Sequence, residues 1–405
     1  MMIKFDKKFN VIYKHGENKI PIMLWLDKVE KGAFEQMSHL SLLPFTFHHV
    51  AGMPDMHQGY GMPIGGVMAA DGYIIPNAVG KDIGCGICVI RTNLFVGSLN
   101  KTVLKRIMRD VRKLIPIGVG GKHKKSQEGM PKLSDIKEFS IENHLVMNYE
   151  WGNASKQLGT LGSGNHFIEI QEGSDGYIWI MIHSGSRNLG SKVCDYYNKI
   201  ATQLNEKWYS SVPKSWGLSF LPFHSEEGQM YFYEMNFCCN FALANRKTMI
   251  DRIKEAFHNN SNVEFDEESF INIHHNYAAM ENHYGRNVLV HRKGATRAYK
   301  GEYGIIPGSQ GTNSYIVIGK GNKLSFKSCS HGAGRVLSRA DAKRKLKLAN
   351  EIEKLDKQNI VHAIRTKNDL EEAPGAYKNI LDVIDHQKDL VDIDVTLKPI
   401  AVLKG

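Results

Sequence analysis

The chain has 405 residues, of which 42% are hydrophobic and 23% are charged, so its composition excludes a wholly disordered protein. Its 52 basic and 42 acidic residues give a net charge of +10, which mildly favours a polyanionic partner such as a nucleic acid. The six cysteines have no regular spacing, which indicates reduced thiols. No apolar run approaches the ~20 residues that cross a bilayer, and none resembles a secretory signal. We therefore expect a cytoplasmic protein without a membrane segment.

Hydrophobic periodicity predicts both helices and strands. Residues 101–115 have helical spacing and are followed by Pro116, which ends the helix, and residues 176–183 form an apolar run typical of a buried strand. Further along, the pattern predicts a helix over 230–256, strands over 288–291 and 314–318, and a helix over 340–355. Helices and strands do not alternate strictly, and no linker divides the chain, so we expect one large α+β domain over residues 1–405.

Histidines are the first candidate functional group, because several of them stand beside glycines or at the end of a predicted strand. They lie in five places along the chain, at His57, His166, His183, the pair His274 and His275, and His331. A single histidine in such a place is more often a structural hydrogen-bonding group than a ligand. Five of them weaken that alternative, since an imidazole at a strand end is presented at a loop, where sites usually form.

An acidic residue and a cysteine lie three positions apart, at Asp82 and Cys85, and the glycines at 84 and 86 permit a turn that brings both to one ion. Carboxylate, thiolate and imidazole together suit zinc, manganese or iron better than magnesium alone. Cys85 also begins a Cys-x-x-Cys pair with Cys88, which leaves a redox or structural-zinc site as an alternative. Because no second such pair exists, we expect Cys88 to lie in the core.

Three glycine-rich segments have the composition of phosphate-binding loops, although none is a complete nucleotide-binding motif. They cover residues 161–166, 306–312 and 331–335. Because residues 336–348 continue with helical spacing, the third segment predicts a helix N-terminus that binds an anion, with His331 as a candidate nucleophile toward phosphorus. An ordinary glycine-rich turn with a capping role is an equally good interpretation of that segment alone.

Basic residues cluster in the predicted helix over 101–115, in residues 122–125 and in residues 343–347. Solvated helix faces account for most such clusters, so contact with nucleic acid is the less frequent alternative for each of them. No aromatic residues are interleaved with the basic ones as in some RNA-binding modules.

Eight motifs follow one another over nearly the whole chain, beginning at Met53, Val79, Leu158, Ile182, His274, Arg292, Gly304 and Ser328. They read MPDMHQG, VGKDIGCG, LGTLGSGNHFIE, IHSGSR, HHNY, RKGA, GIIPGS and SCSHGAGR. Together they resemble the RtcB family of GTP-dependent RNA ligases. Eight motifs in one order are far more specific than any one of them.

The resemblance implies an α+β domain around a polar cleft that holds two manganese ions and GTP. The implied metal ligands are Asp82, Cys85, His166, His183 and His275, with Cys85 bridging both ions. His331 is the implied nucleophile, which takes GMP from GTP as a phosphoramidate. The residues expected to bind the guanylate are Asn165, His166, Phe167, Ile168, Glu169, His275, Asn276, Pro307, Gly308, Ser309, Gln310, Ser314, His331, Gly332, Ala333, Gly334 and Lys404. Phosphates of the RNA are expected at Arg187, Arg335 and Arg339, and Asp55 and His57 are expected beside the metal ligands.

The resemblance also implies the reaction, in which RNA 3′-phosphate or 2′,3′-cyclic phosphate ends are joined to 5′-hydroxyl ends in tRNA splicing or RNA repair. The implied partners are RNA and GTP, the implied state is a monomer, and some relatives have an activating partner protein. The basic clusters would then follow the RNA backbone. Cys88 and Gln310 depart from the usual family pattern, but neither departure removes a ligand or the nucleophile.

Two other classes of protein remain open from the sequence. One is a metal-dependent RNA phosphodiesterase or phosphatase, which uses water as the nucleophile and forms no covalent nucleotide. The other is a non-catalytic RNA-binding protein whose histidines hold structural zinc. Covalent labelling by GTP distinguishes a ligase from both.

Overall fold

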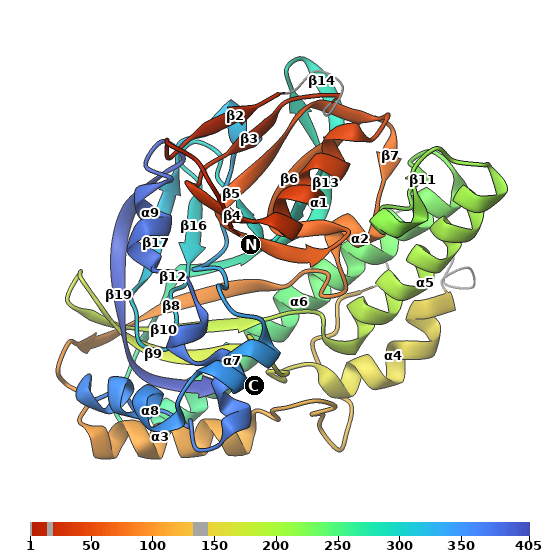
Figure 1. Ribbon diagram of the computed structural model, residues 1–405. Coiled ribbons are helices and arrows are strands. Elements are labelled where there is room, and N and C mark those ends of the chain that lie inside the picture. The colour runs from red at the N-terminus through yellow and green to blue at the C-terminus, as the bar shows by residue number, and fades with distance from the viewer. Residues whose placement is uncertain (1, 14–18, 133–144) are drawn as a thin grey trace.

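Two sheets of seven and six strands form the body of the protein, in a computed structural model that describes residues 2–13, 19–132 and 145–405 (Figure 1). Every neighbouring pair in the seven-stranded sheet is antiparallel. In spatial order its strands are β12 (Phe265–His274), β8 (Gly86–Phe95), β10 (Tyr177–Ser184), β9 (Phe167–Gly173), β19 (Val391–Lys404), β17 (Ser314–Gly319) and β16 (Tyr303–Ile306).

The six-stranded sheet is antiparallel except between β3 and β5, which run parallel. Its order is β13 (Asn276–His283), β14 (Arg286–Lys293), β6 (Met62–Ala70), β5 (Thr46–Tyr60), β3 (Ile22–Leu24) and β2 (Asn10–Ile12). Three short pairs complete the strands: β1 (Met2–Lys4) with β4 (Lys28–Glu30), β7 (Tyr73–Ile74) with β11 (Leu221–Pro222), and β15 (Ala295–Arg297) with β18 (Ser328–Ser330). The chain crosses between the large sheets at His275, the one residue between β12 and β13.

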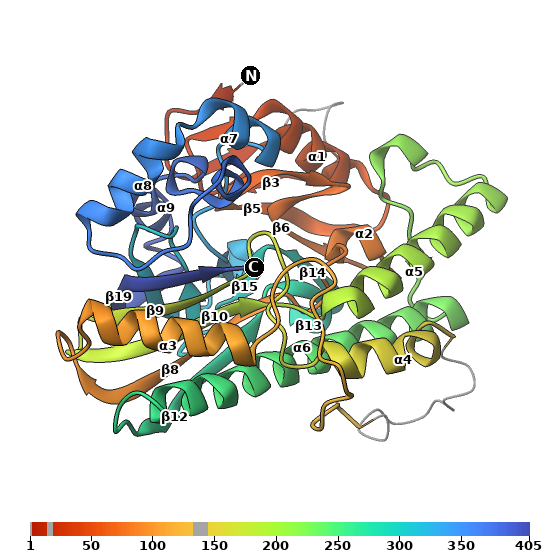
Figure 2. The same cartoon turned by 90° about the horizontal axis from the view of Figure 1, so that it is seen from below.

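Helices cover the outer surfaces of the sheets. They are α1 (Lys31–Leu42), α2 (Pro76–Val79), α3 (Lys101–Leu114), α4 (Leu145–Gln157), α5 (Arg187–Lys207), α6 (Glu226–His258), α7 (Arg339–Lys345), α8 (Leu348–Lys357) and α9 (Ile380–Asp385). The longest, α6, packs against α3, α5 and the seven-stranded sheet, as Figure 2 shows. None of the helices in the described ranges combines the length and apolar content of a bilayer-crossing segment.

The best-predicted elements show why the sequence folds as it does. Helix α3 begins where Asn100 accepts hydrogen bonds from the next turn, and it ends before Pro116. Its apolar face joins a core beneath the seven-stranded sheet that includes Cys88, as expected for that cysteine. Strand β10 lies between β8 and β9 and is buried almost throughout, which explains its unbroken apolar run.

Three further predicted elements are confirmed, since residues 230–256, 288–291 and 314–318 lie within α6, β14 and β17. The single helix predicted over 340–355 is wrong, because it is broken into α7 and α8 at Leu346. Side chains two positions apart on a helix point in nearly opposite directions. The break lets both Leu346 and Leu348 reach the small apolar cluster around Leu355.

Candidate metal and nucleotide site

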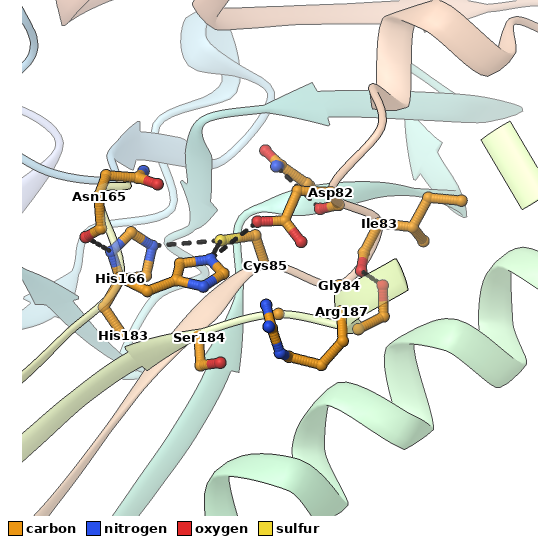
Figure 3. Close-up of polar contacts among 12 residues, drawn as sticks. Asp82, Ile83, Gly84, Cys85, Asn165, His166, His183, Ser184 and Arg187 are labelled. Atoms are coloured by element: carbon orange, nitrogen blue, oxygen red, sulfur yellow. Dashed lines mark hydrogen bonds and ion pairs between the residues drawn. The ribbon is translucent and has the colours of Figure 1, made fainter. Parts of the chain in front are cut away.

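Cys85 lies where two groups of candidate metal ligands meet. One group is Cys85, His183 and His275, the other is Asp82, Cys85 and His166, and within each group the ligand atoms lie within 4.8 Å of one another. Cys85 Sγ lies 3.2 Å from His183 Nε2 and 3.6 Å from His166 Nε2. Asp82 Oδ2 lies 3.0 Å from His166 Nε2 (Figure 3). The structure thus brings all five predicted ligands together, in two sets that share one sulfur.

The sheet topology explains this convergence of distant residues. Strands β12, β8, β10 and β9 are neighbours, so the starts of β8 and β9 meet the ends of β10 and β12 at one edge. Cys85 precedes β8, His166 precedes β9, and His183 lies near the end of β10. His275 follows β12, and its backbone N–H donates to the Cys85 carbonyl over 2.8 Å. Gly84 makes the turn before Cys85 with a φ of +72°, which favours glycine.

Two of the imidazoles are oriented by backbone carbonyls. His166 Nδ1 donates to the Leu161 carbonyl over 2.9 Å, and His183 Nδ1 donates to the Asn165 carbonyl over 3.1 Å. Nδ1 therefore carries a proton in both rings, and Nε2 of each ring is directed toward Cys85. Metal-bound histidines are held in the same way, with the second nitrogen donating to a carbonyl or carboxylate.

Burial determines the charge state of this group. Burial lowers the pKa of His183 and of His275 well below the usual value, so both imidazoles are neutral at pH 7. Burial and the neighbouring Asp82 raise the pKa of the Cys85 thiol, whereas a bound cation would favour the thiolate. Burial opposes ionisation of Asp82, but His166 and Arg187 outweigh it and lower the pKa to about 2. Neutral imidazoles, an ionised carboxylate and a thiol fit a transition-metal ion.

Two adjacent residues of α6 hold the loops of this site in place. The Asn245 side chain accepts hydrogen bonds from the N–H groups of Gly159 and Thr160 and donates to the carbonyls of Thr160 and Gly185. The fully buried Arg246 guanidinium donates to the Gly84 carbonyl over 3.0 Å and to the Ser184 carbonyl over 2.7 Å. No motif in the sequence indicated this role, because both residues lie inside an apolar helix.

Replacing Arg246 with methionine should lower the free energy of unfolding by about 2–5 kcal/mol, because it removes the buried hydrogen bonds that the guanidinium donates to the Gly84 and Ser184 carbonyls and to Asn272 Oδ1. Urea titration followed by circular dichroism measures this loss. The matched control is Lys247→Met at the exposed neighbouring position, which should change the value by less than about 0.5 kcal/mol. Equal stability of the two variants would contradict the supporting role of Arg246.

His331 lies beside the candidate metal ligands and is fixed by Asp55. Its ring centroid is 4.7 Å from that of His275, and its Nδ1 donates to Asp55 Oδ2 over 2.6 Å. The N–H groups of His331 and Gly332 donate to the same oxygen over 3.1 and 3.2 Å. Burial opposes ionisation of Asp55, but His331 and Lys378 outweigh it and lower its pKa, so the carboxylate is charged. The Nε2 atom of His331 forms no hydrogen bond with the residues that the structure describes.

The prediction that residues 331–335 form the N-terminus of a helix is wrong. Residues 336–338 follow without helical structure, and α7 begins only at Arg339, with Ser338 as its capping residue. The N–H groups of His331 and Gly332 instead bind the protein's own carboxylate at Asp55. Gly334 packs against the Asp55 backbone with a φ of +72° and leaves no room for a side chain. This agrees with the alternative of a glycine-rich turn.

A cavity of about 790 Å³ opens over Cys85 and His331. It is large enough for a nucleotide, since ligand pockets span roughly 300–1,000 Å³. The predicted nucleotide-binding residues that line it are Asn165, Phe167, Glu169, His275, Asn276, Pro307, Gly308, Ser309, Gln310, His331, Gly332, Ala333, Gly334 and Lys404. Burial raises the pKa of Glu169 to about 7, against the opposing effect of Lys404.

Three of the predicted nucleotide-binding residues, His166, Ile168 and Ser314, do not line the cavity. The Ile168 side chain lies in the core beneath the seven-stranded sheet. Ser314 is buried and accepts a hydrogen bond from Gly308 N, and Gln310 donates to the Glu372 carbonyl. His57 lines the cavity with its Nδ1 donating to the Asp55 carbonyl over 3.0 Å.

The three predicted phosphate-binding arginines differ in their surroundings. Arg187 starts α5 beside Asp82, with its Nε donating to Thr160 Oγ1 over 3.1 Å (Figure 3). Arg335 is held by Glu372, with Nη1 3.2 Å from a carboxylate oxygen. Arg339 also lies 3.3 Å from Glu372, but half of its side chain is exposed. Arg335 and Arg339 line the cavity, and Arg187 lies behind the candidate metal ligands.

Sequence reasoning gave no role to Lys293. This buried residue lines the cavity and donates to the carbonyls of Tyr60 and Asn77 over 2.6 and 3.0 Å. Burial lowers the pKa of its ammonium to about 8. Its position in the motif that begins at Arg292 could have indicated that Lys293 belongs to the site.

Comparison with known proteins extends over nearly the whole chain. The sequence model of the family described as "tRNA-splicing ligase RtcB" matches residues 36–405. The RNA-splicing ligase RtcB of Escherichia coli (strain K12) is 36% identical over 406 residues, which cover 95% of this chain and 97% of that protein. The tRNA-splicing ligases RtcB of Thermococcus kodakarensis and Nanoarchaeum equitans are 33% and 34% identical, and each alignment covers 99% of this chain and at least 96% of the relative.

Proposed function

This chain belongs to the RtcB family of RNA-splicing ligases, and on that premise we propose that it joins RNA 2′,3′-cyclic phosphate or 3′-phosphate ends to 5′-hydroxyl ends with GTP and manganese. The observation that carries the proposal is the placement of His331, whose Nδ1–H is bound by Asp55 and whose ring lies against His275 inside the cavity. Because a carboxylate-bound imidazole can also serve as the general acid or base of a hydrolase, covalent labelling by GTP decides between the two functions.

Two manganese ions would be held by the two ligand groups that meet at Cys85. When bound, such ions neutralise phosphate charge and lower the pKa of a coordinated hydroxyl. The proposed ligands are Asp82, Cys85, His166, His183 and His275. Soft sulfur and imidazole nitrogen beside a carboxylate make this donor set more suitable for a transition metal than for magnesium.

His331 would be the nucleophile in the first step. Its Nε2 attacks the α-phosphorus of GTP, a phosphorus–nitrogen bond forms, and the bond to the β-phosphate oxygen breaks to release pyrophosphate. Asp55 keeps the proton on Nδ1 and stabilises the positive charge that develops on the ring. Where the RNA ends in a 2′,3′-cyclic phosphate, water first breaks the bond between phosphorus and the 2′-oxygen to give the 3′-phosphate. An oxygen of the RNA 3′-phosphate then displaces the imidazole and takes the GMP. The RNA 5′-hydroxyl finally attacks the activated 3′-phosphate, so that GMP leaves and the strands are joined.

The guanylate would occupy the cavity between the ends of β9 and β19 and the residues that follow β16. Glu169 on β9, Lys404 at the end of β19, and Ser309 and Gln310 after β16 all line this cavity. Arg187 and Arg339 are proposed to bind RNA phosphates. Arg335, which Glu372 holds at the cavity wall, is proposed to bind an RNA phosphate as well. We further propose one domain over residues 1–405 acting as a cytoplasmic monomer on RNA.

Incubation with manganese and GTP labelled at the α-phosphate tests the proposal directly. We expect a covalent label on the denatured protein that is stable in alkali and labile in acid, as for a phosphoramidate. Opening of a 2′,3′-cyclic phosphate without GTP and without a label would overturn the ligase and favour a metal-dependent phosphodiesterase. Metal-dependent folding without turnover would instead indicate an RNA-binding protein.

Replacing Asp55 with asparagine should slow the formation of the covalent label by about 10²–10⁴-fold, because the amide cannot hold the Nδ1–H tautomer of His331 as a carboxylate does. Single-turnover labelling measures the rate, and manganese content should stay unchanged because Asp55 is not among the candidate ligands. The control is Asp71→Asn, the same change in an exposed ion pair with Arg286, which should label at the normal rate. An unchanged rate in Asp55→Asn would remove Asp55 from the mechanism.

A further inference from the structure

The exposed face of α3 is the most basic helical surface in the described part of the chain. This helix carries six basic residues and one acidic residue, a net charge of +5, while the whole chain has +10. Each residue of a helix advances by about 100°, so the six basic side chains lie within an arc of about 140°. The apolar side chains that face the core occupy the opposite arc. The basic residues are Lys101, Lys105, Arg106, Arg109, Arg112 and Lys113.

The basic residues of α3 differ from those of α7 in their partners. On α7, Lys343 pairs with Glu371 over 2.9 Å, and Arg344 and Lys345 both pair with Asp341. On α3, Arg109 and Lys113 share the single acidic residue of the helix. The other four, at positions 101, 105, 106 and 112, are exposed and form no ion pair with the residues that the structure describes. Their charge is therefore available to an external polyanion.

The chain that follows α3 connects this surface to the candidate metal site. The Leu161 N–H donates to the Pro116 carbonyl over 3.1 Å, and the Gly118 N–H donates to the Gly162 carbonyl over 2.7 Å. The Leu161 carbonyl in turn accepts the hydrogen bond that orients His166. In Figure 2, α3 lies along the seven-stranded sheet beside β19, and β19 leads to the C-terminus, where Lys404 lines the cavity. The loop that follows α3 therefore joins this basic helix to the segment that orients a candidate metal ligand.

We propose that the four unpaired basic residues of α3 bind the phosphate backbone of the RNA that flanks the end to be joined. This inference rests on the proposed function for the identity of the polyanion. The helix rises by about 16 Å between Lys101 and Arg112, which is long enough to face several phosphates. Contacts of this kind hold the strand in place without reading its sequence. They matter for a long RNA and not for GTP or for a short oligonucleotide.

The test compares two fourfold variants that remove the same charge. The first is Lys101→Gln, Lys105→Gln, Arg106→Gln and Arg112→Gln on α3. The control is Lys343→Gln, Arg344→Gln, Lys345→Gln and Lys357→Gln, where each basic residue has an acidic partner. A plot of log affinity against log salt concentration has a negative slope. With a long 3′-phosphate RNA, we expect the magnitude of this slope to be smaller by about 3 in the α3 variant than in the unmodified protein. The control should keep its slope within about 1, and both should form the covalent GMP label at the normal rate.

Several outcomes separate this inference from the proposed function. An unchanged slope in the α3 variant, or an equal fall in the control, would overturn the assignment of α3. Absence of the GMP label in the unmodified protein, with the difference in slope preserved, would overturn the ligase and leave RNA binding by α3 standing. A charge-conserving variant, in which lysine replaces arginine and arginine replaces lysine at the same four positions, should have the slope of the unmodified protein, because the number of positive charges is unchanged. If the fourfold variant fails to fold, the double variant Lys105→Gln with Arg112→Gln replaces it in the same measurement. Its slope should change by half as much.

Discussion

Replacement of His331 by alanine should reduce both covalent labelling by GTP and strand joining to background, while manganese content stays at the level of the unmodified protein. The imidazole is the group in the cavity that combines a free Nε2 with a carboxylate-bound Nδ1. Alanine removes the attacking atom, and water cannot replace it in a covalent transfer. The measurements are gel autoradiography after labelling, and metal analysis of the purified protein.

An RNA that already carries GMP on its 3′-phosphate separates the steps for the His331→Ala variant. If His331 acts as the nucleophile of the first step, the variant should join this activated RNA to a 5′-hydroxyl strand. Failure to join it, with metal and RNA bound normally, would show that the imidazole also acts in the last step. Persistence of an acid-labile label would place the nucleophile on another residue and contradict the proposed mechanism.

Replacement of Cys85 by alanine should remove most of the bound manganese and all ligase activity. Its sulfur belongs to both candidate ligand groups, so one substitution leaves each group with only two protein donors. Loss of a shared donor weakens both sites, and metal affinity is linked to the stability of the fold. Metal analysis and calorimetric titration with manganese measure the effect.

Cys88→Ala is the matched control for the Cys85 substitution. Cys88 is also fully buried, but it lies in the core beneath the sheet, with no candidate ligand group around it in the described residues. This variant should lose some stability through the cavity it creates and should keep its manganese content. Equal metal content in Cys85→Ala and in the unmodified protein would remove Cys85 from the ligand set.

Much of the candidate site could be predicted from local sequence. The glycine at 84 indicated a turn between Asp82 and Cys85, and the structure contains that turn with both side chains on one side of it. The apolar run before His183 indicated a strand end, and β10 ends one residue later, at Ser184. Both signals are contained within a few residues, where backbone conformation and side-chain period decide the outcome.

The parts that could not be predicted depend on contacts between distant segments. The N–H groups of His331 and Gly332, which the sequence predicted to bind an external anion, donate to the Asp55 carboxylate instead. Asp55 lies 276 positions from His331 in the sequence. Arg246 supports the loops from the middle of an apolar helix, where its periodicity resembles that of a core residue. The break between α7 and α8 depends on a cluster that includes Ile360 and Val402. Such contacts have no local pattern.

The crossing of the chain at His275 makes assembly of the candidate site a late step in folding. The candidate ligands come from both ends of a loop of more than 190 residues, since Asn276 donates to the Asp82 carbonyl across 194 positions. Closing so long a loop costs entropy before any contact within the site compensates for it, and topologies rich in distant contacts fold slowly. A partly folded chain therefore holds only fragments of the donor set. Recovery of metal binding after dilution from denaturant should follow the slowest phase of refolding.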